Sequence, residues 1–114
     1  MQLTLQRTPP VLIISLEGKL DTVACADFEA QMLRALGDGD RLILMDCQRL
    51  AFIASAGLRV FLLAAKQLRA SGGKLAFAGL QRHVEHVFQI SGFTALFPIY
   101  KTRAEGEKAL AAHR

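Results

Sequence analysis

The sequence predicts an α/β fold in which helices cover a mainly parallel sheet. Short apolar runs rich in β-branched residues alternate along the chain with longer segments whose apolar residues recur at helical spacing. Because parallel strands need a helix-length connection, this alternation favours parallel pairing. The chain has 114 residues, 52% of them hydrophobic, which suffices for one core. We therefore expect residues 1–114 to form a single domain.

Four to five strands are expected, and the first of them should be an antiparallel edge strand. Residues 2–6 alternate polar and apolar side chains, and two prolines separate them from the apolar run 11–16. These two segments predict a hairpin. Pro98 makes the last strand an edge strand, since proline cannot donate a ladder hydrogen bond. The remaining strands are expected over residues 42–45, 74–78 and 95–100.

About four helices are expected, because apolar residues recur every three or four positions in four segments. Gly37 occupies the position of a C-terminal cap for the first helix, and Gly92 should adopt a left-handed conformation after the third, with Phe93 packing on Phe88. Thr102 and Glu105 match a capping box at the start of the last helix. Three of the helices are expected over residues 22–36, 81–90 and 103–112. The second lies between Ser55 and Ser71, and it is marked as amphipathic by Leu58, Phe61, Leu62, Ala65 and Leu68, which should face the core.

Charge and cysteine content limit the possible classes of function. The net charge is +4, but the basic residues are scattered with no aromatic-interleaved basic run, so direct nucleic-acid binding is not expected. Residues 1–7 lack a signal-peptide pattern, and the apolar run 11–16 is too short to span a membrane. We expect a cytoplasmic protein without membrane insertion, in which Cys25 and Cys47 are buried free thiols.

Two segments that follow expected strands are chemically informative. They are residues 18–22, after the second strand, and residues 50–58, after the third. Functional loops gather beyond the carboxyl ends of parallel strands. Because both strands should run in the same direction, we expect the two loops to open onto one rim of the sheet.

Ser55, in the second of these loops, is expected at the N-cap of a helix. The simplest role there is structural, since a serine N-cap contributes on the order of 1 kcal/mol. Gly57 in the first turn disfavours helix formation unless a close approach requires it. The small neighbours Ala54 and Ala56 leave the hydroxyl accessible. A phosphate at this position would meet free backbone amides and the positive end of the helix dipole, and Arg59 lies one turn further on.

These segments resemble a known family. Residues 52–58 resemble the Asp-Ser-Ser-Gly-Leu signature of STAS domains in bacterial anti-sigma factor antagonists, and residues 18–21 resemble that family's Gly-x-Leu-Asp loop. The resemblance extends over residues 3–110 and implies the STAS fold. Three further segments fall in the matching order, at residues 44–46, 72–75 and 90–93.

The resemblance implies a protein-binding switch and not an enzyme. Members bind a serine-kinase anti-sigma factor, which has a histidine-kinase-like ATPase fold, when unphosphorylated. Phosphorylation by that kinase ends the interaction, and a PP2C-type phosphatase restores it. Ser55 matches the phosphoacceptor, and Asp21 matches an aspartate beside it. No cofactor is implied. The expected partner-binding residues are Lys19, Asp21, Thr22, Ala54, Ala56, Gly57, Leu58 and Arg59.

The sequence departs from the family signature at two positions, and this leaves an alternative. Ala54 replaces the aspartate before the acceptor, and Ala56 replaces the serine after it. Loss of the carboxylate removes a local negative charge. The alternative is a STAS subunit that is not phosphorylated, or a ligand-sensing module, within an assembly such as a lipid-transport ATPase or a chemotaxis-like complex.

Catalytic and metal sites are not expected. His83 and His86 are spaced to share a metal on a helix, but no further ligands occur at a suitable spacing. Ser55 lacks the Gly-x-Ser-x-Gly elbow of α/β-hydrolases, because Ile53 stands where the first glycine belongs. A small enzyme would need convergent catalytic groups that the sequence does not provide.

Overall fold

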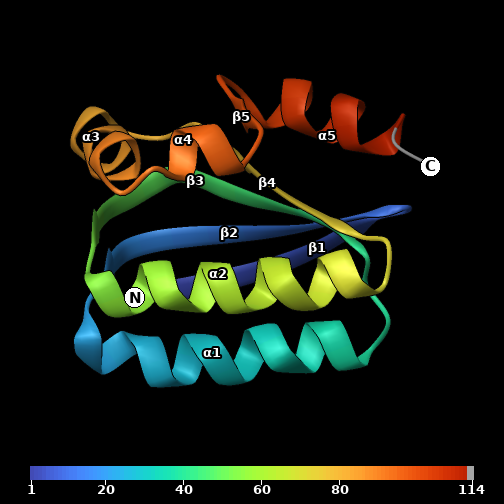
Figure 1. Ribbon diagram of the computed structural model, residues 1–114, viewed down its shortest axis with the longest axis horizontal. Coiled ribbons are helices and arrows are strands. Elements are labelled where there is room, and N and C mark those ends of the chain that lie inside the picture. Colours follow the sequence, from blue (N-terminus) through green and yellow to red (C-terminus); the bar gives the residue numbers. More distant parts are fainter. Residues whose placement is uncertain (113–114) are drawn as a thin grey trace.

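The computed structural model describes residues 1–112, which form a five-stranded sheet in the order β1-β2-β3-β4-β5 (Figure 1). β1 pairs antiparallel with β2 across the Pro9-Pro10 turn, and all other pairs are parallel. The predicted mixed sheet with an antiparallel edge strand is thus confirmed. The strands are β1 (Gln2–Thr8), β2 (Val11–Leu20), β3 (Leu42–Ile53), β4 (Lys74–Ala78) and β5 (Ile99–Tyr100).

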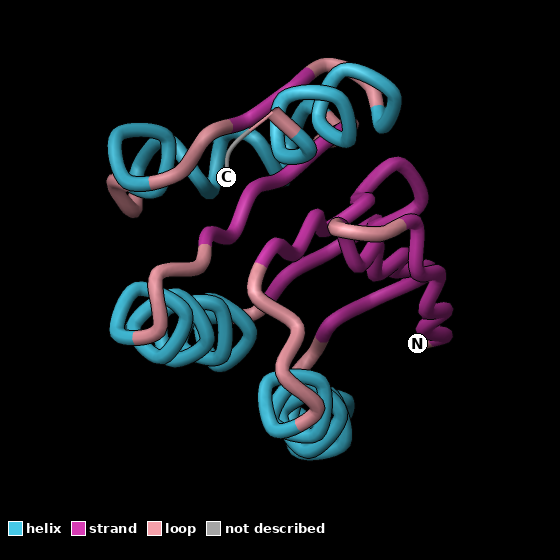
Figure 2. The backbone as a smooth tube through the Cα atoms, turned by 90° about the vertical axis from the view of Figure 1, so that its right-hand side faces the viewer, coloured by secondary structure: helices cyan, strands magenta, loops and turns pink. Residues whose placement is uncertain are grey.

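Helices cover the two faces of the sheet unequally (Figures 1 and 2). α1 and α2 lie side by side on one face, and α3 adds its apolar residues to the same core. α5 packs on the opposite face. The helices are α1 (Thr22–Gly37), α2 (Ser55–Ala70), α3 (Arg82–Ile90), the single turn α4 (Phe93–Leu96) and α5 (Arg103–Ala111).

Phenylalanine rings fill the larger core. Phe61 of α2 packs edge-on against Phe28 of α1, with ring centroids 5.5 Å apart, and against Phe77 of β4 at 4.9 Å. Phe88 of α3 contacts Phe77 at 5.0 Å. Edge-to-face pairs of this kind stabilise a core beyond the area they bury. These four rings therefore join three helices to the sheet.

The expected strand over residues 95–100 is wrong in its first half. The chain forms the helical turn α4 there, and only Ile99–Tyr100 pairs with β4. Gly92 is left-handed (φ 82°) and redirects the chain, as predicted, so that Phe93 packs on Phe88 with centroids 5.3 Å apart. The apolar residues of this segment thus serve ring packing and not a strand, and residues 1–112 contain five helices instead of about four.

Two further details differ from the sequence-based expectations. α1 ends one residue later, at Gly37, its C-cap is Asp38, and the left-handed glycine after it is Gly39 (φ 91°) and not Gly37. Leu62 was expected in the core but is 44% exposed, because the core face of α2 is centred on Phe61 and Ala64.

Both cysteines are buried free thiols, as predicted. Burial raises the pKa of the Cys47 thiol, and Asp46 raises it further. Desolvation likewise raises the pKa of Cys25. Both groups therefore stay protonated at neutral pH and are poor nucleophiles. No helix within residues 1–112 has the length and apolar character needed to cross a membrane.

Candidate functional site

The two informative segments meet at one rim of the sheet, as expected. The Ala54 amide donates to the Leu20 carbonyl at 2.9 Å, which joins the end of β2 to the end of β3. α1 and α2 begin directly after these strands, at the same end of the molecule (Figure 1). Residues 18–20 and 50–53 of the predicted loops are strand, however, because Lys19 pairs with Phe52 and Leu20 with Ile53. The rim is therefore a short, rigid pair of strand-to-helix connections.

Ser55 is the first residue of α2, and the prediction that it is the N-cap is wrong. The N-cap is Ala54, whose carbonyl accepts hydrogen bonds from the amides of Gly57 at 2.9 Å and Leu58 at 3.3 Å. Because Leu20 fixes the Ala54 amide, the chain enters the helix one residue earlier than expected. Ser55 is exposed, and α2 has no side-chain cap and no acidic residue in its first turn. The helix therefore begins with amides that no side chain caps.

Gly57 seats the start of α2 against the sheet. It is buried, and a Cβ atom there would lie 2.8 Å from Leu20 Cδ2 and 3.1 Å from Ile53 Cγ1. Any larger residue would have to displace these side chains. A glycine in the first turn of a helix was expected only where another part of the chain comes close. Leu20 and Ile53 provide that close approach at Gly57. Through this contact, Gly57 fixes the position of Ser55.

Asp21 caps α1. Its carboxylate accepts a hydrogen bond from the Ala24 amide at 2.9 Å, the usual geometry of an N-cap aspartate. Within residues 1–112, no hydrogen bond joins Asp21 to Ser55. The backbone contact between Leu20 and Ala54 brings the two helix starts together, while the Asp21 side chain is occupied by its own helix.

The other predicted partner-binding residues lie around these two helix starts. Lys19, Thr22 and Arg59 are exposed, whereas Ala54, Ala56 and Leu58 are partly buried. Two exposed apolar side chains near these helix starts, Val23 (88% exposed) and Phe52 (44% exposed), were not among the predicted partner-binding residues. Val23 lies in the first turn of α1, opposite the buried Cys25 and Phe28, so helical periodicity could have found it.

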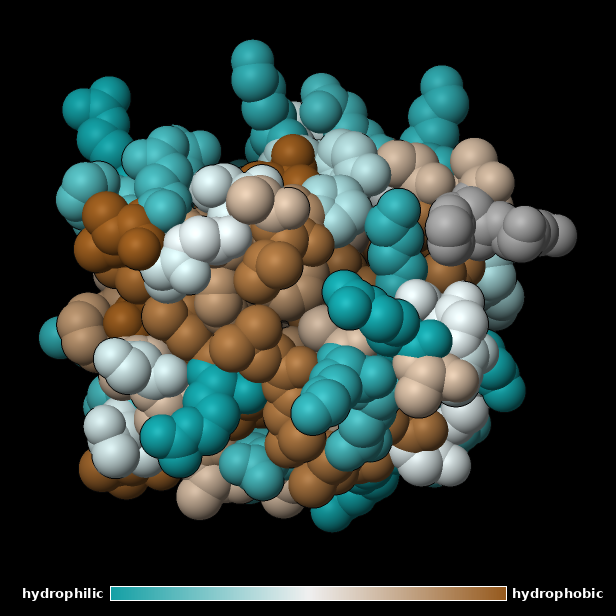
Figure 3. Space-filling model, in the orientation of Figure 1, coloured by the Kyte–Doolittle hydropathy of each residue, from teal (hydrophilic) through white to brown (hydrophobic). Residues whose placement is uncertain are grey.

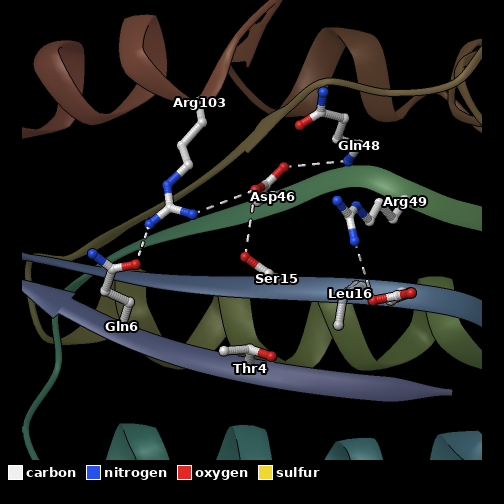
Figure 4. Close-up of a pocket in the computed structure, with 9 residues that line it drawn as sticks. Thr4, Gln6, Ser15, Leu16, Asp46, Gln48, Arg49 and Arg103 are labelled. Atoms are coloured by element: carbon white, nitrogen blue, oxygen red, sulfur yellow. Dashed lines mark hydrogen bonds and ion pairs between the residues drawn. The ribbon is translucent and has the colours of Figure 1, made fainter.

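A polar cavity of about 310 Å³ opens on the face of the sheet that α5 covers, opposite α1 and α2 (Figure 4). Its central acid is Asp46, which accepts hydrogen bonds from Ser15 Oγ at 3.4 Å and the Gln48 amide at 3.2 Å. Arg103, the first residue of α5, lies 3.7 Å from Asp46 and donates to Gln6. The cavity is lined by Thr4, Gln6, Ser15, Leu16, Glu17, Asp46, Gln48, Arg49 and Arg103.

The charges in this cavity are already paired. Besides the Asp46–Arg103 pair, Arg49 lies 3.8 Å from Glu17. The network fastens the start of α5 to β1, β2 and β3. The sequence does not place Asp46 beside Arg103, because these residues are far apart in the chain.

The pair His83 and His86 does not form part of a metal site in the described part of the chain. Within residues 1–112, no group of three His, Cys, Asp or Glu side chains is placed to hold a metal ion. The His83 ring instead contacts the backbone carbonyl of Ala51 and so links α3 to the end of β3.

Comparison with known families agrees with this geometry. The sequence model that describes the STAS domain family matches residues 2–106 of this chain. The chain belongs to the STAS domain family. It is 40% identical, over all of its 114 residues and 96% of the relative, to BtrV of Bordetella bronchiseptica, which carries the name of an anti-sigma factor antagonist. It is 29% identical over 101 residues to an anti-sigma F factor antagonist of Paenibacillus polymyxa, covering 88% of this chain and 86% of that protein.

Solved structures show that the STAS fold is shared over nearly the whole chain. A Thermotoga maritima protein named as an anti-sigma factor antagonist superposes with a TM-score of 0.90 at 21% identity, covering 95% of this chain and 93% of the other. The Bacillus protein SpoIIAA, solved in its phosphorylated form, gives a TM-score of 0.77 at 24% identity over 96% and 99% of the two chains. Unphosphorylated SpoIIAA gives 0.73 at 24% identity over 95% and 94%.

Proposed function

We propose that this STAS domain is an anti-sigma factor antagonist that works by partner switching. It binds a serine-kinase anti-sigma factor while Ser55 is unphosphorylated, and phosphorylation of Ser55 ends the interaction. One observation carries the proposal. Ser55 is exposed at the start of an uncapped helix, at the position that resembles the family's phosphoacceptor. The relatives named as anti-sigma factor antagonists support this assignment.

The start of α2 suits a serine that is alternately free and phosphorylated. A phosphoserine carries a charge of about −1.5 to −2 at neutral pH. Here it would face the positive end of the helix dipole and amides that no side chain caps. The domain itself would therefore accommodate the phosphate without unfolding. A partner packed over the same rim would instead have to bury the new charge, which weakens binding.

The neighbouring residues divide into those that position the rim and those that present side chains to a partner. Gly57 and the Asp21 cap fix the starts of α2 and α1. Lys19, Thr22 and Arg59 are exposed and can contact a partner directly. The proposed partners are a serine-kinase anti-sigma factor with a histidine-kinase-like ATPase fold and a PP2C-type phosphatase that removes the phosphate.

Phosphate mapping tests the acceptor. The purified chain, incubated with ATP and the histidine-kinase-like serine kinase encoded nearest to its gene, should gain one phosphate, and peptide mass spectrometry should locate it at Ser55. Ser55→Ala should abolish incorporation. Ser71→Ala is the matched control, because Ser71 is an exposed serine just after the other end of the same helix. A phosphate that persists in Ser55→Ala, or that maps elsewhere, contradicts the assignment.

Binding measurements test the switch. Ser55→Ala should bind the kinase with the same affinity as the unphosphorylated wild-type chain, because the substitution removes only a hydroxyl from an exposed position. Ser55→Asp should bind more weakly, since it places a charge at the same point of the rim. Equal affinity of the two variants would remove the electrostatic basis of the switch.

A second candidate function is a STAS subunit that senses a ligand and is not phosphorylated. The polar cavity around Asp46 favours it, because hydroxyl, amide and guanidinium groups converge there. Ala54, which replaces the family's aspartate, points the same way. Copurification with an ABC-type ATPase, together with no phosphate transfer from any serine kinase of the same genome, would favour this alternative.

A further inference from the structure

We propose that the partner-binding surface continues along α2, beyond the Ser55 rim, and that it binds an acidic, apolar-faced surface of the anti-sigma factor. This inference rests on the proposed function. It adds Leu62, Ala65, Lys66 and Arg69 to the residues expected to contact the partner. We name these four residues, together with Leu58 and Arg59, the α2 surface.

The α2 surface has an apolar stripe that the core uses only in part, because Leu58 and Ala65 are partly buried and pack against the core while Leu62 is exposed. The core side of α2 is formed by Gly57, Val60, Phe61, Ala64 and Leu68. Beside it, the apolar positions 58, 62 and 65 follow at helical spacing, and the middle one, Leu62, is 44% exposed. Figure 3 shows apolar surface over α2 and in the region between α2 and α4.

The stripe is flanked by cations that have no acidic partner. Arg59, Lys66 and Arg69 are exposed, and the sequence of α2 contains no aspartate or glutamate. Within residues 1–112, none of these three side chains forms an ion pair. An apolar stripe with unpaired positive charge beside it is complementary to a partner that presents apolar side chains among carboxylates.

The same charges argue against a second copy of this chain as the occupant. A two-fold symmetric contact through α2 would set the cations of one copy against those of the other. The neighbouring helix α1 differs, because its exposed Leu33 (40%) has Glu29 and Arg34 nearby in sequence, so the charge around it is mixed. The uncompensated positive charge is therefore a property of α2 and not of this whole face.

Position along the helix connects the α2 surface to the switch. Leu58 and Arg59 lie one turn after Ser55, and the surface ends at Arg69, roughly 21 Å from Ser55 at the rise of an α-helix. A single partner of ordinary interface size, about 800 Å² on each side, can cover both regions. The rim would then carry the phosphate-sensitive contact, while the stripe supplies phosphate-independent affinity.

Two substitutions test the α2 surface, each with a matched control. Isothermal titration against the purified kinase of the phosphate-mapping experiment should show Leu62→Asp binding about tenfold or more weakly than wild type, because the aspartate would place an unpaired carboxylate in a contact with an acidic partner. Lys66→Glu should bind about threefold or more weakly, with a flatter dependence on salt. The controls are Leu33→Asp, which has nearly the same exposure on α1, and Lys101→Glu, an exposed cation before α5.

The outcomes separate this inference from the proposed function. If both controls keep wild-type affinity while Leu62→Asp and Lys66→Glu lose it, the α2 surface is a contact. If both α2 variants bind like wild type while Ser55→Asp still weakens binding, the α2 surface is overturned and the switch stands. If wild type does not bind the kinase at all, both proposals fail. If Lys66→Glu lowers only the binding of phosphatidylcholine–phosphatidylglycerol vesicles, the surface is a lipid contact and the inference is wrong.

Discussion

The two helices that start at the rim differ in how their first turns are stabilised. α1 begins with Asp21, whose carboxylate accepts the Ala24 amide at 2.9 Å. α2 begins after Ala54, which provides no side-chain cap, and its first turn holds no acid. Both starts lie at the ends of adjacent parallel strands. The first turn of α1 therefore already has a negatively charged acceptor, whereas the first turn of α2 can still accept an anion.

The two starts also differ in how closely they contact the sheet. The first turn of α2 is pressed onto Leu20 and Ile53 through Gly57. The first turn of α1 presents Val23, which is 88% exposed. Close packing can hold α2 in place where a cap is missing. This packing explains how α2 can begin at Ser55 without a side-chain cap.

The largest effect is expected from Gly57→Ala. The added methyl group would meet Leu20 Cδ2 at 2.8 Å, so it should lower the free energy of unfolding by about 1–3 kcal/mol through overpacking. Chemical denaturation measures this change. Gly37→Ala is the control, because nothing lies within 4 Å of its Cβ position and alanine favours helix. Equal stability of Gly57→Ala and wild type would show that the start of α2 is not held by packing.

A smaller effect is expected from removing the cap of α1. Asp21→Ala leaves the Ala24 amide without its acceptor and should lower the free energy of unfolding by about 1 kcal/mol. Asp21→Asn retains an acceptor oxygen and should lose much less. Thermal denaturation of the two variants distinguishes a cap from a role that needs the negative charge. If Asn and Ala are equally destabilising, the charge and not the hydrogen bond is what α1 requires.

The smallest effect is expected from giving α2 the cap that α1 has. Ala54 has an extended backbone (φ −87°, ψ 162°), which is N-cap geometry, so Ala54→Asp should raise the free energy of unfolding by roughly 0.5–1 kcal/mol. Ala54→Asn separates the hydrogen bond from the charge. Chemical denaturation of both variants provides the readout. Destabilisation by both would mean that the first amides of α2 are not available to an acceptor.

Much of the fold was predictable because local patterns agree with the tertiary structure. The apolar runs at 11–16, 42–45 and 74–78 each lie within a strand, and the Thr102 cap is present, with its hydroxyl accepting the Glu105 amide at 3.1 Å. The common rim followed from parallel strand direction alone. These features depend on residues close together in the chain.

The errors arose where tertiary contacts override local pattern. The strands β2 and β3 continue through the predicted loops because they pair with each other, which neither segment reveals by itself. Ser55 looked like an N-cap, but the hydrogen bond between Ala54 and Leu20 starts the helix one residue earlier. Residues 95 and 96 are helical because Gly92 turns the chain so that Phe93 can reach Phe88. The first two of these contacts join residues that are far apart in the chain, and the third was predicted without the helical turn that it requires.

The affinity of the partner kinase for the Ser55-phosphorylated chain tests the central claim most directly. The chain would be phosphorylated to completion, and its binding to the kinase compared by isothermal titration with that of the unphosphorylated chain. Because the phosphate adds a charge of about −1.5 to −2 at the rim, we predict at least tenfold weaker binding, with the far-ultraviolet circular dichroism spectrum unchanged. Equal affinity of the two forms would contradict a switch at Ser55.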